Sequence, residues 1–389
     1  MKLREFTERA EQYIVGIAQS RRRTRQDRLL RGLLFMLSRL YQSIVQLRLS
    51  AYQSRVLRQR MLGCLVVSIG NLTVGGTGKT PVVEVFAKTL AARGRRVAVL
   101  SRGYRSKKRP LWMKLRDAFL RKDHEVPPRI VSDGQRLLLD SASAGDEPFM
   151  LATNLKDVMV LVDKDRVKSG KYAIRHMQAD TLILDDGFQH LKLKPRYNIL
   201  LVDATLPFAN HHLLPRGLLR EPIANLRRAD YIFLTKSDGA HRLRHLKRFI
   251  RNHNSRAEIV ECTHRPKHLQ DVYTGERRSL EDLKGRRVAA ISAIAVPRSF
   301  EAFVATLGAN LVYAERFVDH HRYRQQEVID FLNAAAASGA EMIVTTEKDA
   351  VRFPKLDRRD IPIQFLRVEI DILSGKESFN ECIARLCFQ

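Results

Sequence analysis

A glycine-rich segment between a buried strand and a helix constrains the fold of this 389-residue chain more than any other feature. The apolar run from Cys64 to Ile69 predicts the strand, and the run from Pro81 to Ala87 predicts the helix. Between them stand Gly75, Gly76, Thr77, Gly78, Lys79 and Thr80. Small residues let consecutive backbone N–H groups converge on an anion, and a helix N-terminus adds partial positive charge. The segment therefore predicts a phosphate-binding loop.

The last two residues of this loop have specific chemical roles. We expect Lys79 to pair with the outer phosphates of a nucleotide and the Thr80 hydroxyl to ligate magnesium. The generic loop pattern has glycine where this chain has Thr73. An ordinary glycine-rich corner is the alternative, but it does not account for strand, loop, Lys-Thr pair and helix occurring in this order.

Several short apolar runs downstream predict further strands, at Arg96–Leu100, Val158–Val162, Thr181–Leu184, Asn198–Val202, Tyr231–Leu234 and Arg287–Ile291. Strands that alternate with helices form a parallel sheet, whose functional loops lie at the carboxyl ends of the strands. The predicted fold class is α/β, a P-loop NTPase-like, mostly parallel sheet flanked by helices.

Three domains are predicted. They are a basic amphipathic helical segment (1–60), a core around the phosphate-binding loop (61–284) and a smaller C-terminal α/β domain that closes over the site (285–389). The core is expected to contain a surface insertion at about 105–143, with an amphipathic helix near Leu111 to Leu120.

Two acidic motifs add to the loop. Asp185 and Asp186 follow a predicted strand, as does the metal-binding carboxylate of phosphate-loop enzymes, although a polar turn gives the same pattern. Asp146 and Glu147 precede a predicted helix, where an acidic pair is commonly an N-cap. The tetrapeptide Thr235 to Asp238 resembles the base-reading motif of some GTPases.

The formal net charge of +27 indicates a polyanionic partner, which charge alone does not identify. In the segment 1–60, leucines recur at helical spacing beside arginines, which favours an anionic bilayer surface; a helix packed on its own domain is the alternative. No apolar run is long enough for a transmembrane helix, and no signal peptide is visible. Aromatic residues are not interleaved with the basic runs, so we expect no specific nucleic-acid binding.

Seven motifs together resemble the tetraacyldisaccharide 4'-kinase family of lipid A biosynthesis. They occur in the family's order, and Thr73 is a normal feature of the family. The motifs are Ser68–Pro81, Leu100–Tyr104, Gly145–Pro148, Asp185–His190, Leu219–Pro222, Phe317–His321 and Thr346–Ala350. The chain departs from the family at Arg105, where a second glycine is usual.

This resemblance implies a kinase that uses ATP and Mg²⁺ to phosphorylate the 4'-hydroxyl of an acylated glucosamine disaccharide 1-phosphate, a lipid A precursor. It implies a peripheral protein at the cytoplasmic face of the bacterial inner membrane, in contact with the anionic membrane surface. No obligate protein partner is evident.

The resemblance also implies roles for individual residues. Lys79 holds the phosphates, Thr80 and Asp186 serve the metal, and Asp146 is the general base paired with His320. The loop residues Gly75 to Gly78 bind the nucleotide. Supporting or substrate-binding positions are Arg102, Tyr104, Glu147, Asp185, Gln189, His190, Glu221 and Asp319.

Three other functions compete with the kinase. A membrane-attached GTPase of the signal-recognition type is motivated by the loop and by Thr235 to Asp238, and it requires GTP selectivity. A partitioning ATPase needs lysine where Val74 stands. A nucleic-acid binder is motivated by charge alone.

Overall fold

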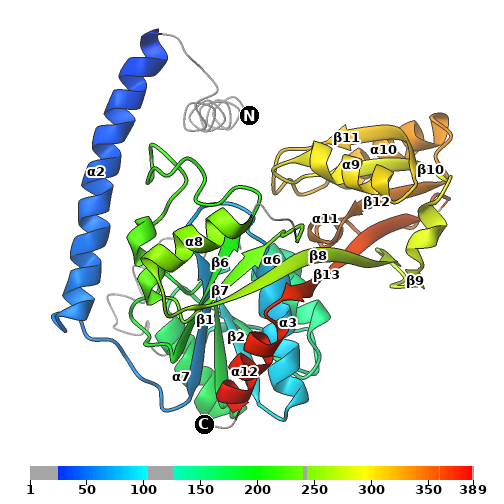
Figure 1. Cartoon of the computed structure of the whole chain (residues 1–389). Coiled ribbons are helices and arrows are strands. Elements are labelled where there is room, and N and C mark those ends of the chain that lie inside the picture. Colours follow the sequence, from blue (N-terminus) through cyan, green and yellow to red (C-terminus); the bar gives the residue numbers. More distant parts are fainter. Residues whose placement is uncertain (1–24, 104–125, 240–242, 359, 388–389) are drawn as a thin grey trace. The chain divides into compact units, whose positions relative to one another are not determined.

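The computed structural model of the chain describes residues 25–103, 126–239, 243–358 and 360–387 (Figure 1). The described residues form two compact units. Unit 1 takes its residues from Met1–Val97, Ile174–Thr263 and Ile372–Gln389, and unit 2 from Ala98–Ala173 and His264–Asp371. The domain boundaries expected after residues 60 and 284 stay a prediction.

Unit 1 is built on a parallel sheet of buried strands. Strand β1 pairs with β5 on one side and β6 on the other, β6 pairs with β7, and β7 pairs with the beginning of β8, all in parallel. The strands are β1 (Leu65–Asn71), β5 (Thr181–Asp185), β6 (Tyr197–Asp203), β7 (Tyr231–Thr235) and β8 (Glu258–Asp271). The parallel sheet predicted from these apolar runs is confirmed.

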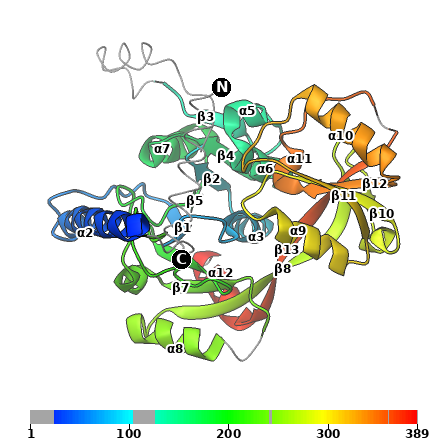
Figure 2. The same ribbon diagram turned by 90° about the horizontal axis from the view of Figure 1, so that it is seen from above.

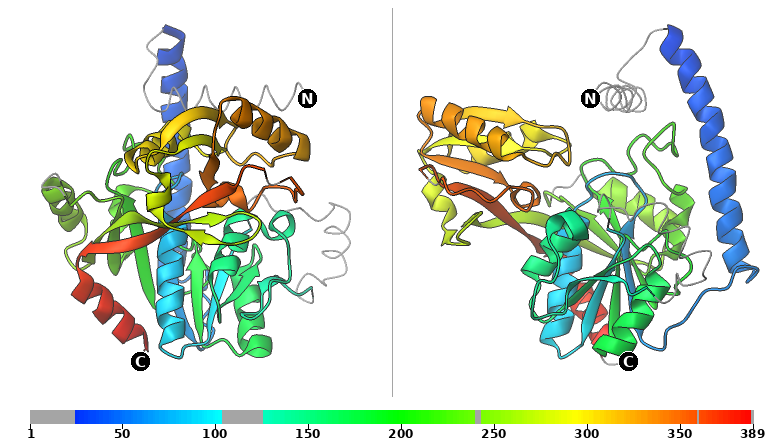
Figure 3. Two further views of the ribbon diagram at one scale, coloured as in Figure 1. Left: turned by 90° about the vertical axis from the view of Figure 1, so that its right-hand side faces the viewer. Right: turned by 180° about the vertical axis from the view of Figure 1, so that it is seen from behind.

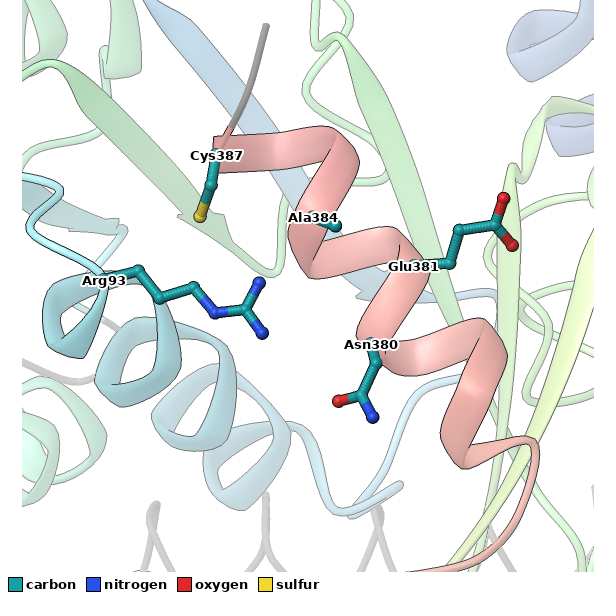
Figure 4. A pocket seen from close by; sticks show the side chains of 5 residues that line it. All are labelled: Arg93, Asn380, Glu381, Ala384 and Cys387. Carbon is teal, nitrogen blue, oxygen red and sulfur yellow. The ribbon is translucent and has the colours of Figure 1, made fainter.

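Five helical segments accompany this sheet: α2 (Arg25–Gln53), α3 (Lys79–Ala92), the 3₁₀ helix η2 (Ile223–Arg228), α8 (Leu243–His253) and α12 (Lys376–Cys387). Helix α12 lies beside α3 (Figure 3). The ring centroid of Phe379 in α12 lies 5.3 Å from that of Phe86 in α3 and 6.2 Å from that of Phe233 in β7. A shallow groove between the end of α3 and α12 is lined by Arg93, Asn380, Glu381, Ala384 and Cys387, none of them a predicted site residue (Figure 4).

Helix α2 is covered by unit 1 on one face only. Leu34, Ser38 and Leu49 are buried, and the Ser38 hydroxyl donates to the Leu213 carbonyl over 3.0 Å. Large apolar side chains are nevertheless exposed along the same helix, at Leu29, Leu33, Met36, Leu40, Ile44 and Leu47. Among the described residues, no helix combines the length and the apolar character needed to cross a membrane.

Unit 2 contains another run of parallel strands, in which β10 pairs with β11 and β12, and β12 pairs with β13. Its strands are β10 (Arg287–Ser292), β11 (Asn310–Arg316), β12 (Met342–Thr346) and β13 (Ile363–Ser374). Successive side chains of a strand point to opposite faces. Ala289 and Ile291 accordingly pack with α10 (Gln325–Ala337), whereas Val288 and Ala290 pack with α9 (Pro297–Thr306). Figure 2 shows these two helices on the two sides of the sheet.

The remaining elements of unit 2 include the strands that precede the Gly145–Pro148 motif. Strand β2 pairs with β4 in parallel, and β3 pairs with β4 in the antiparallel direction. The elements are β2 (Val97–Ser101), β3 (Arg129–Ser132), α5 (Ser141–Ala144), α6 (Asp146–Asn154), β4 (Met159–Val162), α7 (Arg166–Met177), β9 (Arg277–Arg278), η3 (Leu280–Leu283) and α11 (Glu347–Ala350). The helix predicted near Leu111 to Leu120 lies outside the described residues, as does Tyr104.

Candidate active site

The glycine-rich loop of unit 1 connects the end of β1 to the first residue of α3, as predicted. Gly75 and Gly78 have φ angles of 121° and 75°, a backbone region that side chains with a Cβ atom disfavour. A Cβ atom placed on Gly75 or Gly76 would meet no atom within 4 Å, so the loop leaves open space above its backbone. A ligand can therefore approach the peptide groups of the loop closely.

Lys79 and Asp186 lie close together at the end of the sheet. The Lys79 ammonium donates to Oδ1 of Asn71 over 3.3 Å and lies 3.6 Å from Oδ1 of Asp186. Asp186 itself has a φ angle of 53°, in the left-handed region that a residue other than glycine rarely adopts. Such backbone outliers concentrate at functional sites.

Arg220 holds the Asp186 carboxylate by two hydrogen bonds. Its Nη1 donates to Oδ2 over 2.8 Å and its Nη2 donates to Oδ1 over 2.9 Å, which is a bidentate pairing. From the sequence, the arginine-rich loop Leu213–Pro222 either grips a phosphate or is solvated, and Arg220 was not singled out within it. The same Nη2 donates to the Asn71 carbonyl over 3.0 Å, so Arg220 joins Asp186 to the end of β1.

The other residues of the Asp185–His190 motif support this arrangement. Asp185 is buried at the end of β5, opposite Ile69 of β1 in the parallel register. The Gln189 amide donates to the Asn71 carbonyl over 3.0 Å. His190 lines a cavity of about 190 Å³, together with Leu49 of α2 and Arg228.

The Thr235–Asp238 motif contacts the loop backbone. The Thr235 hydroxyl donates to the Thr77 carbonyl over 2.8 Å, and the Lys236 ammonium donates to the Gly76 carbonyl over 2.8 Å. Lys236 also pairs with Asp203 at 2.6 Å. The motif that prompted the GTPase alternative thus tethers the phosphate-binding loop to the end of β7.

Glu221 and Arg102 are two further residues that the resemblance assigned to the site. The buried Glu221 carboxylate accepts hydrogen bonds from Asn225 and Arg228, both at 2.7 Å, which ties η2 to the loop before it. Arg102 is exposed just after β2.

Unit 2 contains a second cluster, centred on the buried Asp146 at the start of α6. Its Oδ2 lies 3.2 Å from Nδ1 of His320, a residue 174 positions further along the chain. Arg352 donates from Nε to the same oxygen over 2.8 Å, and Arg322 donates to Oδ1 over 3.0 Å. Asp146 and His320, which the predicted boundary at 284 places in different domains, both belong to unit 2.

His320 is held by its backbone and by both ring nitrogens. Its φ angle is 66°, and its N–H donates to the Ala293 carbonyl over 3.1 Å. On the ring edge away from Asp146, Nε2 lies 3.1 Å from the Lys348 ammonium and 4.0 Å from an Asp319 carboxylate oxygen. Lys348 in turn lies 3.7 Å from the Glu147 carboxylate.

The surroundings of Asp146 favour its ionised form. Burial raises the pKa of this carboxyl, but the hydrogen bond from His320 and the charges of Arg352 and Arg322 outweigh burial and hold the pKa below its ordinary value. Asp146 is therefore an ionised acceptor at neutral pH.

Sequence reasoning missed three cations of this cluster, Arg322, Lys348 and Arg352. Lys348 stands inside the Thr346–Ala350 motif, and Arg352 follows Asp349 by three residues, a spacing at which side chains meet on a helix. Arg352 also donates to Asp349 over 3.0 Å, so one guanidinium joins two buried carboxylates. No general sequence motif predicts the contacts that Lys348 and Arg352 make.

The loop of unit 1 has donors suited to magnesium. Thr80 stands in the first turn of α3, which follows β1. Asp185 ends the neighbouring strand β5 and Asp186 follows it; parallel strands end at the same edge of a sheet. Hydroxyl and carboxylate oxygens are the hard ligands that Mg²⁺ takes, and this ion commonly keeps several waters. Across the described residues, no group of three His, Cys, Asp or Glu side chains is arranged to hold a metal.

The chain is similar to known proteins of one family. A model of the tetraacyldisaccharide-1-P 4'-kinase family matches residues 30–387. A tetraacyldisaccharide 4'-kinase of Anaeromyxobacter dehalogenans is 41% identical over 352 residues, covering 88% of this chain and 87% of that protein. One of Geobacter metallireducens is 40% identical over 338 residues, covering 86% and 92%.

A solved structure is similar over almost the whole chain. The crystal structure of LpxK from Aquifex aeolicus in complex with ATP has a TM-score of 0.71 and 28% identity, and the match covers 92% of this chain and 100% of that one. The fold class predicted from the sequence is thereby confirmed. Because the family model matches residues 30–387 and a relative of this family is 41% identical, the chain belongs to the tetraacyldisaccharide 4'-kinase family.

Proposed function

We propose that this chain transfers the γ-phosphoryl group of ATP to the 4'-hydroxyl of an acylated glucosamine disaccharide 1-phosphate. Family membership supports the reaction, and it favours the kinase over the GTPase, whose motif here contacts the loop backbone through Thr235 and Lys236. The observation that carries the site assignment is the 3.2 Å contact between Asp146 and His320, which come from two separate family motifs.

In this proposal the loop of unit 1 binds the triphosphate. The backbone N–H groups of Gly75 to Gly78 and the Lys79 ammonium hold the phosphate oxygens, because both supply positive charge where the transferred group is most negative. Thr80 and Asp186 would hold Mg²⁺, with Asp185 supporting Asp186. The bound ion supplies charge neutralisation at the phosphates.

Arg220 has a defined part in this arrangement. Its bidentate contact with Asp186 places a guanidinium beside a carboxylate that the proposal assigns to the metal. A planar guanidinium also matches the geometry of phosphate oxygens. Arg220 is therefore suited to hold Asp186 in the absence of nucleotide and to contact phosphate in its presence.

Asp146 acts as the general base in unit 2. A sugar hydroxyl is a weak nucleophile, and phosphoryl transfer passes through a loose transition state in which the proton leaves late. A carboxylate with a lowered pKa suits this order of events, since it stays ionised until the hydroxyl proton becomes acidic. The contact with His320 keeps the carboxylate oriented.

Helix α2 is proposed to attach the protein to an anionic membrane surface, as a peripheral protein at the cytoplasmic face of the inner membrane. Its exposed apolar residues include Leu29 and Leu47, whose side chains are 80% and 73% exposed. Arg28, Arg39 and Arg48 are exposed on the same helix. A helix that combines such residues binds in the headgroup region of a bilayer.

A phosphate-transfer assay tests the reaction. Purified protein with Mg²⁺ and γ-labelled ATP is expected to label the acylated disaccharide 1-phosphate, and no labelled lipid forms without the acceptor. GTP in place of ATP is expected to give little transfer. Absence of labelled lipid with folded protein in detergent would contradict the proposed reaction, and preference for GTP would restore the GTPase alternative.

A further inference from the structure

Lys348 occupies a position from which it can determine which ring nitrogen of a neutral His320 carries the proton. It is the second residue of α11, a one-turn helix whose N-cap Thr346 accepts a hydrogen bond from the backbone of Asp349. Its ammonium lies 3.1 Å from Nε2 of His320, and the two side chains are 27% and 14% exposed. The Glu147 carboxylate, 3.7 Å away, holds the ammonium from the other side.

Two cations and two carboxylates lie around the His320 ring: Arg352 and Asp146 at Nδ1, and Lys348 and, at 4.0 Å, Asp319 at Nε2. They allow two hydrogen-bond arrangements at Nδ1. Nδ1 lies 3.2 Å from the Asp146 carboxylate, which can only accept, and 3.1 Å from Nη2 of Arg352, which can only donate. A protonated Nδ1 therefore donates to Asp146, whereas an unprotonated Nδ1 accepts from Arg352. The two arrangements exclude each other.

Lys348 selects between them. An ammonium has three N–H donors and no acceptor, so Nε2 can bond to it only as an unprotonated acceptor. The neutral ring then carries its proton on Nδ1, which donates to Asp146.

We propose that Lys348 is a positioning residue for phosphoryl transfer, which fixes His320 as the Nδ1–H tautomer and thereby keeps His320 hydrogen-bonded to Asp146. This inference rests on the proposed role of Asp146 as base. Glu147 has a supporting part, since its carboxylate keeps the ammonium next to Nε2. Neighbouring residues of the Gly145–Pro148 motif thus act on the two ends of one imidazole, Asp146 at Nδ1 and Glu147 through Lys348 at Nε2.

Nitrogen NMR of histidine-labelled full-length protein tests the assignment without any substrate. His320→Gln identifies the His320 signals. In the wild-type protein the protonated nitrogen of His320 is expected to be Nδ1. In Lys348→Met the proton is expected to move to Nε2, because Nδ1 can then accept from Arg352. Lys355→Met, at an exposed lysine of the same unit, is the matched control and leaves the tautomer unchanged.

Kinetics measure the consequence for transfer. We expect Lys348→Met to lower kcat roughly tenfold to hundredfold, part of what a well-positioned base contributes, with the KM for ATP unchanged. Lys348→Arg keeps a donor at Nε2 and is expected to retain the Nδ1–H tautomer and most of kcat. If Lys348→Met does not fold, Lys348→Ala serves for the same two readouts.

Two results would overturn the inference: an Nδ1–H tautomer that persists without Lys348, or a changed tautomer with wild-type kcat. Failure of the proposed function gives a different pattern. In that case the wild-type protein forms no phosphorylated lipid, while the tautomer still responds to Lys348→Met.

Discussion

The guanidinium of Arg352, whose side chain is fully buried, donates from Nε to Oδ2 of Asp146 over 2.8 Å. Asp146 begins α6 and Arg352 follows α11, so this ion pair joins two segments of unit 2 that are 206 residues apart. Its second contact, to the buried Asp349, makes Arg352 the centre of a paired charge network. Removing the guanidinium leaves two carboxylates buried without this partner.

Arg352→Met is therefore expected to destabilise the fold by about 3–5 kcal/mol, the usual cost of breaking a buried ion pair from one side. Denaturant unfolding measures the change. Arg358→Met is the control, because the Arg358–Asp360 pair is solvent-exposed and its loss should hardly shift the unfolding midpoint. Equal midpoints for the two variants would contradict the importance of the buried network.

The lowered pKa of Asp146 predicts a pH dependence of stability. A carboxyl whose folded-state pKa lies below its unfolded value of about 3.9 stabilises the fold above that value, and the stabilisation is lost as the pH falls through the folded pKa. The free energy of unfolding should thus decrease from about pH 5 downwards. Asp146→Asn should show a shallower decrease over the same range, and an unchanged slope would contradict the assignment.

The proposal assigns ATP binding to the loop of unit 1 and the general base to unit 2. Substitutions in the two units should therefore affect ATP binding and turnover separately. Lys79→Met removes a charged contact to phosphate, worth about 1.5–3 kcal/mol, so ATP should bind roughly tenfold to hundredfold more weakly. Asp146→Asn and His320→Gln should bind ATP normally and lose turnover. Calorimetric titration with Mg·ATP, beside the transfer assay, separates the two cases. Wild-type turnover in Asp146→Asn would contradict its role as the base and leave Asp146 a structural residue of unit 2.

The exposed apolar residues of α2 predict membrane binding. Replacing Met36, Leu40 and Leu47 by glutamine should lower the affinity for anionic vesicles, measured by co-sedimentation, at least tenfold. Each side chain that leaves the acyl boundary loses about 1 kcal/mol or more of binding free energy. Leu206→Gln, at an exposed leucine outside α2, should have no effect. If the triple substitution leaves vesicle binding unchanged, α2 is instead a helix that only packs on its own domain.

The sequence predicted the phosphate-binding loop and the parallel sheet because both depend on local patterns. Apolar runs mark β1, β5, β6 and β7, and glycine spacing marks the loop. The association of Asp146 with His320 was expected only through family resemblance, since no local pattern links residues 174 positions apart. The structure brings them together because α6 and the segment after β11 belong to one compact unit.

The residues that the sequence did not assign share a physical cause. Arg220, Lys348 and Arg352 are cations in a chain with 69 lysines and arginines, where one more basic residue carries no signal of its own. Their importance follows from contacts with Asp186, His320 and Asp146, which are fixed by tertiary structure. Helix α12 was likewise not assigned, because its packing against Phe86 and Phe233 depends on residues distant in the sequence.

The position of the transferred phosphate tests the central claim most directly. The acylated disaccharide 1-phosphate is incubated with the protein and Mg·ATP, and the lipid product is analysed by mass spectrometry and ³¹P NMR. We predict one added phosphate, on the 4'-oxygen, with one ADP released for each lipid converted. ADP release without a phosphorylated lipid, or a phosphate on any other oxygen, would contradict the account.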